Sequence, residues 1–396
     1  MSEVVSLESL CSGIIDCPHS TPNWKVSGIP VIRNYNLVSG RIDKTNLSYV
    51  TEEEFLLRTK RAIPEYEDII ISREAPMGVV GIVPEKFKCC LGQRLVLLKV
   101  DKEKCYPKFL LYSLMSNFVQ KQIERVNLTG SIVSNLNISS LQDLQINLVT
   151  YSQQVDIANC LDLLDQKIAI NNQINEELEA MAKTLYDYWF VQFDFPDENG
   201  KPYKSSGGKM VYNDQLKREI PEGWGVKPLG ELADLYQPQT LSEKDLISNG
   251  RYFVYGANGI IGKYNKYNHE TPMLAIACRG NSCGVINITQ PFSWITGNAM
   301  VVKPKFEYIC IDYLKYSLLN GNIYKTISGS AQPQITRTNL SPLLLLQADE
   351  TILSEYADRI NSMFSLRIKN FQQNQELTQL RDWLLPMLMN GQVKVE

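Results

Sequence analysis

The 396-residue sequence lacks the long apolar stretches and the leader pattern that mark membrane and secreted proteins. No uninterrupted apolar run approaches the ~18 residues that a bilayer-spanning helix needs. Met1 is followed by Ser2 and Glu3 rather than by a basic stretch and then an apolar one, which argues against a secretory signal. We therefore expect a cytoplasmic protein with no membrane contact.

Histidine is scarce, and the cysteines show no ligand spacing. The only histidines are His19 and His269, and the nine cysteines include no CxxC pair. An odd, scattered set of cysteines favours neither a disulfide framework nor a zinc site. We expect reduced thiols that pack as small buried apolar residues.

Familiar catalytic signatures are also scarce. The sequence has no GxxxxGK[ST] phosphate loop, no HExxH and no Asn- or Asp-Pro-Pro-aromatic tetrad of the kind that amino-methyltransferases carry. Carboxylates are plentiful, but no cluster for metal-dependent cleavage stands out. We expect no catalytic residue, no metal site and no cofactor in this chain.

Charge is unevenly distributed along a chain whose formal net charge is only −3. Residues 151–200 carry 2 basic and 10 acidic side chains, whereas residues 201–345 carry 16 basic and 10 acidic ones. Residues 1–150 are close to neutral, and residues 346–396 are slightly acidic. Because phosphate repels acidic surfaces and attracts basic ones, we expect any nucleic acid to contact 1–150 and 201–345.

The sequence repeats itself. Matching residues occur in the same order in the two halves, at offsets between 199 and 222, and the preserved order is more informative than any one match. The matches are Leu7 and Leu10 with Leu229 and Leu232, Arg73 and Gly78 with Arg279 and Gly284, Tyr112-Ser113-Leu114 with Tyr316-Ser317-Leu318, Gly130-Ser131 with Gly329-Ser330, and Leu141 with Leu340. We interpret the chain as two copies of one unit, each a globular block followed by a long helix.

Each copy ends in a pattern typical of a coiled-coil helix, with apolar residues at alternating steps of four and three. Asparagines occupy two seam positions of the first helix and recur in the second. A buried asparagine on such a seam selects register and partner at some cost in stability. The expected helix-pairing residues are Leu161, Leu164, Ile168, Asn171, Asn175 and Leu178 in the first helix, and Asn370, Asn374 and Leu377 in the second. Arg367 and Arg381 also fall on the second seam, and a solvated, Asn-rich amphipathic helix stays open as the alternative.

The predicted fold class is α+β, because buried strand-like runs alternate with short helical segments in both blocks. Two similar globular mixed α/β blocks are joined by two long antiparallel helices that form a coiled coil, with a pseudo-twofold relation between the repeats. The expected boundaries are 1–150 for the first block, 151–192 for the central helix, 193–219 for a polar, turn-rich linker, 220–346 for the second block and 347–396 for the C-terminal helix.

Side chains suited to base edges lie on turns next to the predicted strands. Arginine pairs with guanine, and asparagine or glutamine with adenine, through two hydrogen bonds. The candidate DNA-contacting residues are Arg33, Asn34, Arg73, Gln93, Arg94, Ser131 and Asn135 in the first copy, and Arg279, Asn298, Gln332, Gln334 and Arg337 in the second. Arg73 and Arg279 recur, although a shared arginine could equally brace the fold. For each candidate, the alternative is a loop side chain that satisfies nearby backbone.

Four stretches resemble the specificity subunit of Type I restriction–modification systems, and the resemblance extends over essentially the full chain. The stretches are Gln153-Gln154-Val155-Asp156-Ile157-Ala158 with Leu161 to Ile168, Leu185-Tyr186-Asp187-Tyr188-Trp189-Phe190, Ile220-Pro221-Glu222-Gly223-Trp224, and Leu384-Leu385-Pro386-Met387-Leu388-Met389-Asn390-Gly391-Gln392-Val393. The chain departs from many relatives at Thr150-Tyr151, where they have a proline, and its second helix lacks the Gln153-Gln154 pair.

The resemblance implies that each globular block is a target recognition domain that reads one half of a split site in double-stranded DNA. The paired helices would act as a spacer and bind two modification (methyltransferase) subunits, and restriction subunits would join that core. S-adenosylmethionine, ATP and magnesium would belong to those partners, so the chain itself would be non-catalytic. Because the second helix departs from the pattern, its contact with a modification subunit is expected to differ from the first.

Two rival functions stay open on the sequence alone. The first is a DNA nuclease or methyltransferase with an unrecognised active site, which cleavage or methylation of DNA by the purified chain would favour. The second is a protein-binding coiled-coil scaffold, which a lack of DNA protection in the presence of modification subunits would favour.

Overall fold

Contacts divide the chain into two compact units. A computed structural model describes residues 3–129, 135–329, 332–393 and 395. Unit 1 comprises Met1–Ile170 and Gln373–Glu396, and unit 2 comprises Asn171–Gln372. No helix among the described residues combines the length and the apolar character that a bilayer span requires.

The centre of unit 1 is a four-stranded antiparallel sheet with strand order β2-β10-β7-β8. A smaller sheet, β6-β3-β9, contains the one parallel pair among the described strands of the unit, β3 with β9. The elements are β1 (Glu3–Ser6), the 3-10 helix η1 (Glu8–Leu10), β2 (Cys11–Asp16), β3 (Ile29–Ile32), the 3-10 helix η2 (Asn34–Asn36), β4 (Leu37–Val38), β5 (Arg41–Ile42), β6 (Ser48–Val50), α1 (Glu52–Arg58), β7 (Ile69–Ser72), β8 (Val80–Ile82), β9 (Cys90–Leu91), β10 (Leu95–Val100), α2 (Pro107–Met115), α3 (Asn117–Thr129), α4 (Ile138–Gln142) and β11 (Gln145–Leu148).

The central strands are apolar on both faces because each face covers a different core. Ile69 and Ile71 of β7 pack into a core shared with α2 and the long helices. Ile70, which points to the other side, packs with Ile32 of β3 and Leu91 of β9. This alternation explains why β7 is a continuous apolar run rather than an alternating one.

Unit 2 repeats the four-stranded and the three-stranded sheet of unit 1 with the same strand order. Its four-stranded antiparallel sheet is β15-β21-β18-β19, and its small sheet β17-β16-β20 again has one parallel pair among the described strands, β16 with β20. The elements are β12 (Met210–Asn213), β13 (Arg218–Pro221), β14 (Gly225–Pro228), α6 (Leu229–Leu232), β15 (Ala233–Tyr236), the 3-10 helix η4 (Glu243–Asp245), β16 (Tyr252–Gly256), β17 (Gly259–Tyr264), β18 (Leu274–Ala277), β19 (Ile286–Ile288), β20 (Trp294–Ile295), β21 (Ala299–Pro304), α7 (Ile311–Asn320), the 3-10 helix η5 (Ile323–Thr326), α8 (Arg337–Leu340) and β22 (Leu344–Gln347).

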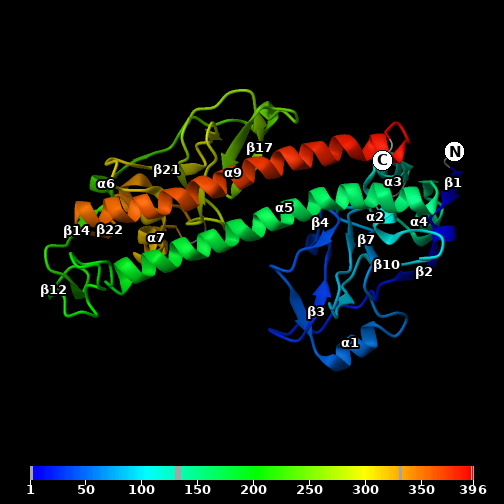
Figure 1. The fold of residues 1–396 in the computed structure, drawn as a ribbon, viewed down its shortest axis with the longest axis horizontal. Coiled ribbons are helices and arrows are strands. Elements are labelled where there is room, and N and C mark those ends of the chain that lie inside the picture. Colours follow the sequence, from blue (N-terminus) through cyan, green and yellow to red (C-terminus); the bar gives the residue numbers. More distant parts are fainter. Residues whose placement is uncertain (1–2, 130–134, 330–331, 394, 396) are drawn as a thin grey trace. The chain divides into compact units, whose positions relative to one another are not determined.

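The internal repeat is therefore confirmed at the level of sheet topology; Figure 1 labels elements of both units. The pair β1–β11 corresponds to β14–β22, and α2 and α4 correspond to α7 and α8. Gly78 and Gly284, matched in the sequence, both take positive φ angles, +76° and +92°, in the turn that joins the third and fourth strands of their sheets. The predicted mixed α/β fold with two similar blocks and long helices is thus confirmed.

The segment before β14 is folded, in contrast to the open linker that its composition predicts. Strands β12 and β13 form an antiparallel hairpin. Phe195 stacks on Tyr203 and on Trp224, with 4.7 Å between ring centroids in each pair. Phe195 and Trp224 belong to the hydrophobic core of unit 2. Burial of these rings therefore orders a segment whose sequence is otherwise polar and rich in turn residues.

Two long helices follow the two blocks: α5 (Tyr151–Tyr186), which continues into a π-helical turn (Asp187–Val191), and α9 (Glu350–Met389). The start of α5 has a capping box, since Gln153 Oε1 accepts from the backbone N–H of Thr150 (3.3 Å) and the Thr150 hydroxyl accepts from the N–H of Gln153 (3.5 Å). Asp349 caps α9 by accepting from the N–H of Thr351 (2.8 Å).

Within unit 1, the start of α5 packs antiparallel against the end of α9. Ile157 shares a core with Leu388, and further along α5 the carboxylate of Asp165 accepts from Nη1 of Arg381 (2.8 Å). The hydroxyl of Tyr112 on α2 donates to the same carboxylate (2.7 Å). Burial, followed by the charge of Asp165, raises the pKa of Tyr112, so the phenol remains a donor. The ion pair with Asp165 therefore offsets the cost of burying the charge of Arg381 on an apolar seam.

Within unit 2, the end of α5 packs antiparallel against the start of α9. Nδ2 of Asn370 donates to Oδ1 of Asn175 (3.0 Å), as the seam asparagines predict. Glu179 of α5 forms an ion pair with Arg367 of α9, and Arg367 also pairs with Asp312 of α7 (3.0 Å). The globular block of unit 2 is thus linked to both helices. All nine predicted helix-pairing residues are buried or half-buried, and Leu161 and Asn171 are fully buried.

Candidate nucleic-acid interface

One end of the central sheet of unit 1 gathers most of the predicted DNA-contacting residues of the first copy. The loops after β2, β3 and β7 and the loop before β10 all meet there. Arg33, Asn34, Gln93 and Arg94 line a single hollow of about 370 Å³. The other lining residues are Pro22, Trp24, Tyr35, Ala75 and Pro76. Four residues that the sequence analysis chose separately thus share one surface.

The side chain of Arg33 lies against two aromatic rings. Its guanidinium carbon is 5.2 Å from the ring centroid of Trp24 and 4.9 Å from that of Tyr35. Nη1 of Arg33 also donates to the hydroxyl of Tyr35 (3.5 Å). Sequence reasoning missed both aromatic residues, although a lone tryptophan in a polar loop was an available signal.

The other polar residues of the hollow are bonded within the protein. Nδ2 of Asn34 donates to the backbone oxygen of Glu74 (2.5 Å), and the Glu74 carboxylate pairs with Nε of Arg94 (3.1 Å). The side chain of Gln93 donates to the carbonyl of His19. Arg94 has a φ of +68°, so its side chain leaves a sharp turn at the start of β10.

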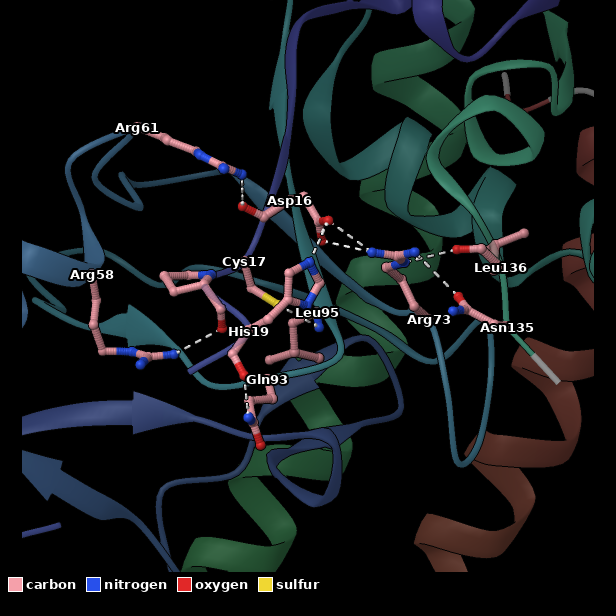
Figure 2. Close-up of polar contacts among 11 residues, drawn as sticks. Asp16, Cys17, His19, Arg58, Arg61, Arg73, Gln93, Leu95, Asn135 and Leu136 are labelled. Atoms are coloured by element: carbon pink, nitrogen blue, oxygen red, sulfur yellow. Dashed lines mark hydrogen bonds and ion pairs between the residues drawn. The ribbon is translucent and has the colours of Figure 1, made fainter. Parts of the chain in front are cut away.

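Arg73 is buried and braces the loops rather than facing solvent, as Figure 2 shows. Its Nη1 donates to both carboxylate oxygens of Asp16 (2.8 Å each), and its Nε donates to the backbone oxygen of Leu136 (2.9 Å). Its Nη2 donates to Oδ1 of Asn135 (3.2 Å). Each guanidinium nitrogen of Arg73 thus has an acceptor in the protein. Ser131, another predicted contact, lies outside the described residues.

Backbone hydrogen bonds identify Cys278, not Arg279, as the equivalent of Arg73. The N–H of Arg73 donates to the carbonyl of Arg94 (2.8 Å), and the N–H of Cys278 donates to that of Asn298 (3.2 Å). The sequence match of Arg73 with Arg279 is therefore wrong by one residue, because the turn before Gly284 is one residue longer than the turn before Gly78. The same bonds place Asn298 where unit 1 has Arg94, just before the corresponding strand.

A neutral pair replaces the Asp16–Arg73 ion pair in unit 2. The strand registers place Gln237 where unit 1 has Asp16. The Gln237 side chain donates to the carbonyl of Gly297 (3.3 Å), and the thiol of Cys278 donates to the carbonyl of Ile276 (3.4 Å). The same two positions thus hold a charged pair in one unit and neutral residues in the other.

In unit 2, the end of the sheet that corresponds to the hollow of unit 1 carries much smaller side chains next to its strands. We call this end of each sheet the reading edge. Gly256, the last residue of β16, and Ala257 stand where Arg33-Asn34 follows β3, and Gly297-Asn298 stands where unit 1 has Gln93-Arg94. The long polar side chains of this edge come from other loops. Arg279, Gln332, Gln334 and Arg337 are all exposed, and Arg279 forms a β-bridge with Gln334. The two units thus present different surfaces on the same framework.

One stretch of unit 2, Gly280-Asn281-Ser282-Cys283-Gly284, matches the GxSxG pattern of serine hydrolases. In those enzymes the serine stands on a turn from a strand to a helix. Here the turn joins the antiparallel strands β18 and β19, so the local structure differs from a nucleophile elbow. Among the residues that the structure describes, no group of three or more His, Cys, Asp or Glu side chains is placed to hold a metal ion.

Comparison with known proteins points to one family. The model of the Type I restriction modification DNA specificity domain matches residues 2–180 and 221–345. The chain is 24% identical over 369 residues to the Type I restriction enzyme MjaIX specificity subunit of Methanocaldococcus jannaschii, with 88% of this chain and 82% of the relative covered. It is 23% identical over 377 residues to the HindI specificity subunit of Haemophilus influenzae, with 76% and 81% covered. The crystal structure of a Type I restriction-modification system S subunit from M. genitalium aligns with a TM-score of 0.53 at 18% identity, covering 98% of this chain and 96% of the other.

Proposed function

The chain belongs to the Type I restriction modification DNA specificity family, and from this premise we propose that each unit reads one half of a split site in double-stranded DNA. The observation that carries the proposal is the contrast between the two reading edges. Unit 1 presents Arg33, Gln93 and Arg94 where unit 2 presents Gly256, Gly297 and Asn298 on the same strands. A shared framework with unlike edge residues is what two readers of different half-sites require.

The exposed side chains of both edges match the chemistry of the major groove. Arginine recognises the N7 and O6 acceptors of guanine, and asparagine or glutamine recognises adenine. Unit 2 contributes Arg279, Gln332, Gln334 and Arg337 from loops that follow β18 and precede or begin α8. Residues 251–345, which include these loops, carry 9 basic and 3 acidic side chains, so the surface also attracts phosphates.

Catalysis is assigned to partner subunits. Two methyltransferase subunits bind the helices, each methylating an adenine in one half-site after flipping it out of the duplex, and restriction subunits join that complex. S-adenosylmethionine, ATP and magnesium belong to these partners. Exposed apolar side chains on the helices support a protein contact: Leu163 is 64% exposed and Trp383 56% in unit 1, and Met181 is 52% exposed in unit 2. Large apolar residues on a helix surface are typical of interfaces.

The paired helices act as a spacer, and their length sets how many unread base pairs separate the half-sites. Inserting seven residues into α5 near Asn171, and seven into α9 near Asn374, preserves the heptad register. At about 1.5 Å per residue the insertion lengthens the pair by roughly 10 Å, or about three base pairs. We expect the methylated motif to gain about three unread base pairs while both half-sites stay unchanged.

The experiment is methylation mapping of DNA from cells that produce the chain with its methyltransferase subunits. The same seven residues inserted in the exposed turn at Asn199-Gly200 serve as the control and should leave the motif unchanged. An altered half-site in the helix variant would contradict the spacer role. A wild-type chain that directs no methylation in the presence of its partners would contradict the proposed function itself.

A further inference from the structure

Two large aromatic side chains are exposed at the hollow of unit 1. Trp24 is 39% exposed and Tyr35 is 49% exposed, and both contact the guanidinium of Arg33. A guanidinium that lies on aromatic rings gains cation–π energy and keeps its N–H edge available. It also loses less side-chain entropy when it binds, because it is already ordered.

The backbone around these aromatic residues is fixed. Oδ1 of the buried Asn36 accepts from the N–H of Arg33 (3.0 Å). The hydroxyl of Tyr35 is 3.4 Å from Oγ of Ser48. The N–H of Lys25, next to Trp24, donates to the carbonyl of Tyr49 (2.9 Å). Hydrogen bonds among three segments, those around Trp24, Arg33 and Ser48, thus position the aromatic rings that contact Arg33.

Arg33 differs from the other polar residues of the hollow. The side chains of Asn34, Gln93 and Arg94 bond to backbone carbonyls or to a carboxylate. Among the described residues, Arg33 forms no ion pair, and its guanidinium donates to the neutral hydroxyl of Tyr35. Of the two arginines in the hollow, Arg33 is therefore the one whose guanidinium can donate to two new acceptors without breaking an ion pair.

We infer that Arg33, positioned by Trp24 and Tyr35, reads a guanine in the half-site of unit 1. Guanine presents two adjacent acceptors in the major groove, N7 and O6, which match the two parallel N–H donors of an arginine fork. Adenine presents a donor at the second position and is therefore rejected. The inference rests on the proposed function and adds the residue, the base and the half-site.

The inference applies to one half-site only. In unit 2 the corresponding residue is Gly256, the last residue of β16, which has no side chain that could reach a base. The guanine contact is therefore expected to be absent from the corresponding position of the other half-site.

The test is to map the methylated motif for the full chain, produced with its methyltransferase subunits, in the wild type and in Arg33→Ala. We expect one guanine position to become degenerate while the other half-site is unchanged. In competition binding, the variant complex should lose roughly 5- to 150-fold of the preference for that guanine. Trp24→Ala should reduce the preference for guanine at the same motif position by a smaller factor, because Arg33 is still present but no longer held against the Trp24 ring.

A matched control is Arg359→Ala, since Arg359 also lies over a tryptophan, Trp189, at 5.5 Å but on α9. The motif should stay unchanged in this variant. If Arg33→Ala weakens binding equally for all sequences or abolishes methylation while the control is active, Arg33 holds a phosphate and the inference is wrong. A Trp24→Ala variant that relaxes a different position would also overturn it. Neither result affects the proposed function, which fails only if the wild-type chain directs no methylation.

Discussion

Replacing Arg73 with alanine should destabilise unit 1 without relaxing the recognised sequence. The substitution removes the arginine partner of the Asp16 carboxylate, which keeps only its contact with the exposed His19 (3.1 Å), and it removes donors to Leu136 and Asn135. Loss of one partner of a buried ion pair costs about 3–5 kcal/mol. Because the Asp16 side chain is 20% exposed, water compensates part of that loss, so we expect about 3 kcal/mol.

The second unit supplies the compensating variant. Gln237 and Cys278 occupy the positions of Asp16 and Arg73, so Asp16→Gln with Arg73→Cys copies a pair that this fold already accepts. The double variant should recover to within about 1 kcal/mol of the wild type, which corresponds to a coupling energy of at least about 3 kcal/mol between the two positions. Each single variant should be less stable than the double one.

Thermal melting and hydrogen exchange measure these differences. For a unit of this size, 3 kcal/mol lowers the melting temperature by about 6–12 °C. Faster exchange should be confined to β7 and β10 and their neighbours, because the brace joins the ends of those strands. If Arg73→Ala melts like the wild type and its methylation motif becomes degenerate, Arg73 reads DNA and the reasoning is refuted.

Three further perturbations test the helices and unit 2. Arg381→Ala should cost about 3 kcal/mol because it leaves the buried carboxylate of Asp165 unpaired, and urea unfolding should show less loss in the double variant with Asp165→Asn. Replacing both Asn175 and Asn370 with leucine should raise the melting temperature, because a polar seam pair costs stability, while broadening the spacer length in the methylated motif; a lower melting temperature would contradict this role. Burial lowers the pKa of His269, so the folded state disfavours its protonation, and unit 2 should lose stability as the pH falls below about 6.5. Melting curves at pH 7.5 and 5.5 should show this loss in the wild type and a smaller one in His269→Gln.

Much of the fold follows from periodic patterns in the sequence. The heptads of α5 and α9, the apolar runs of β7 and β10 and the order of the repeated segments all predict elements that the structure contains. These patterns are readable because burial of one helix face or of both strand faces constrains residue type at regular intervals. The glycines at 78 and 284 are predictable for a similar reason, since each turn needs a positive φ.

The assignment of the polar residues required the tertiary structure. Arg73 and Arg33 are both arginines next to a strand, yet Arg73 is enclosed by Asp16 and Asn135 while Arg33 lies on exposed aromatic rings. Neither environment is visible locally, because the partners come from segments up to 62 residues away. The same holds for Arg381, whose partner Asp165 is 216 residues distant in the chain.

The sequence by itself determined the repeated architecture, the paired helices and the family resemblance, because hydrophobic periodicity and motif order are local properties of the chain. Only the tertiary structure decided which arginine braces a loop and which one lies exposed on aromatic rings. The physical reason is that a polar side chain acts through the particular donors, acceptors and rings that folding brings around it.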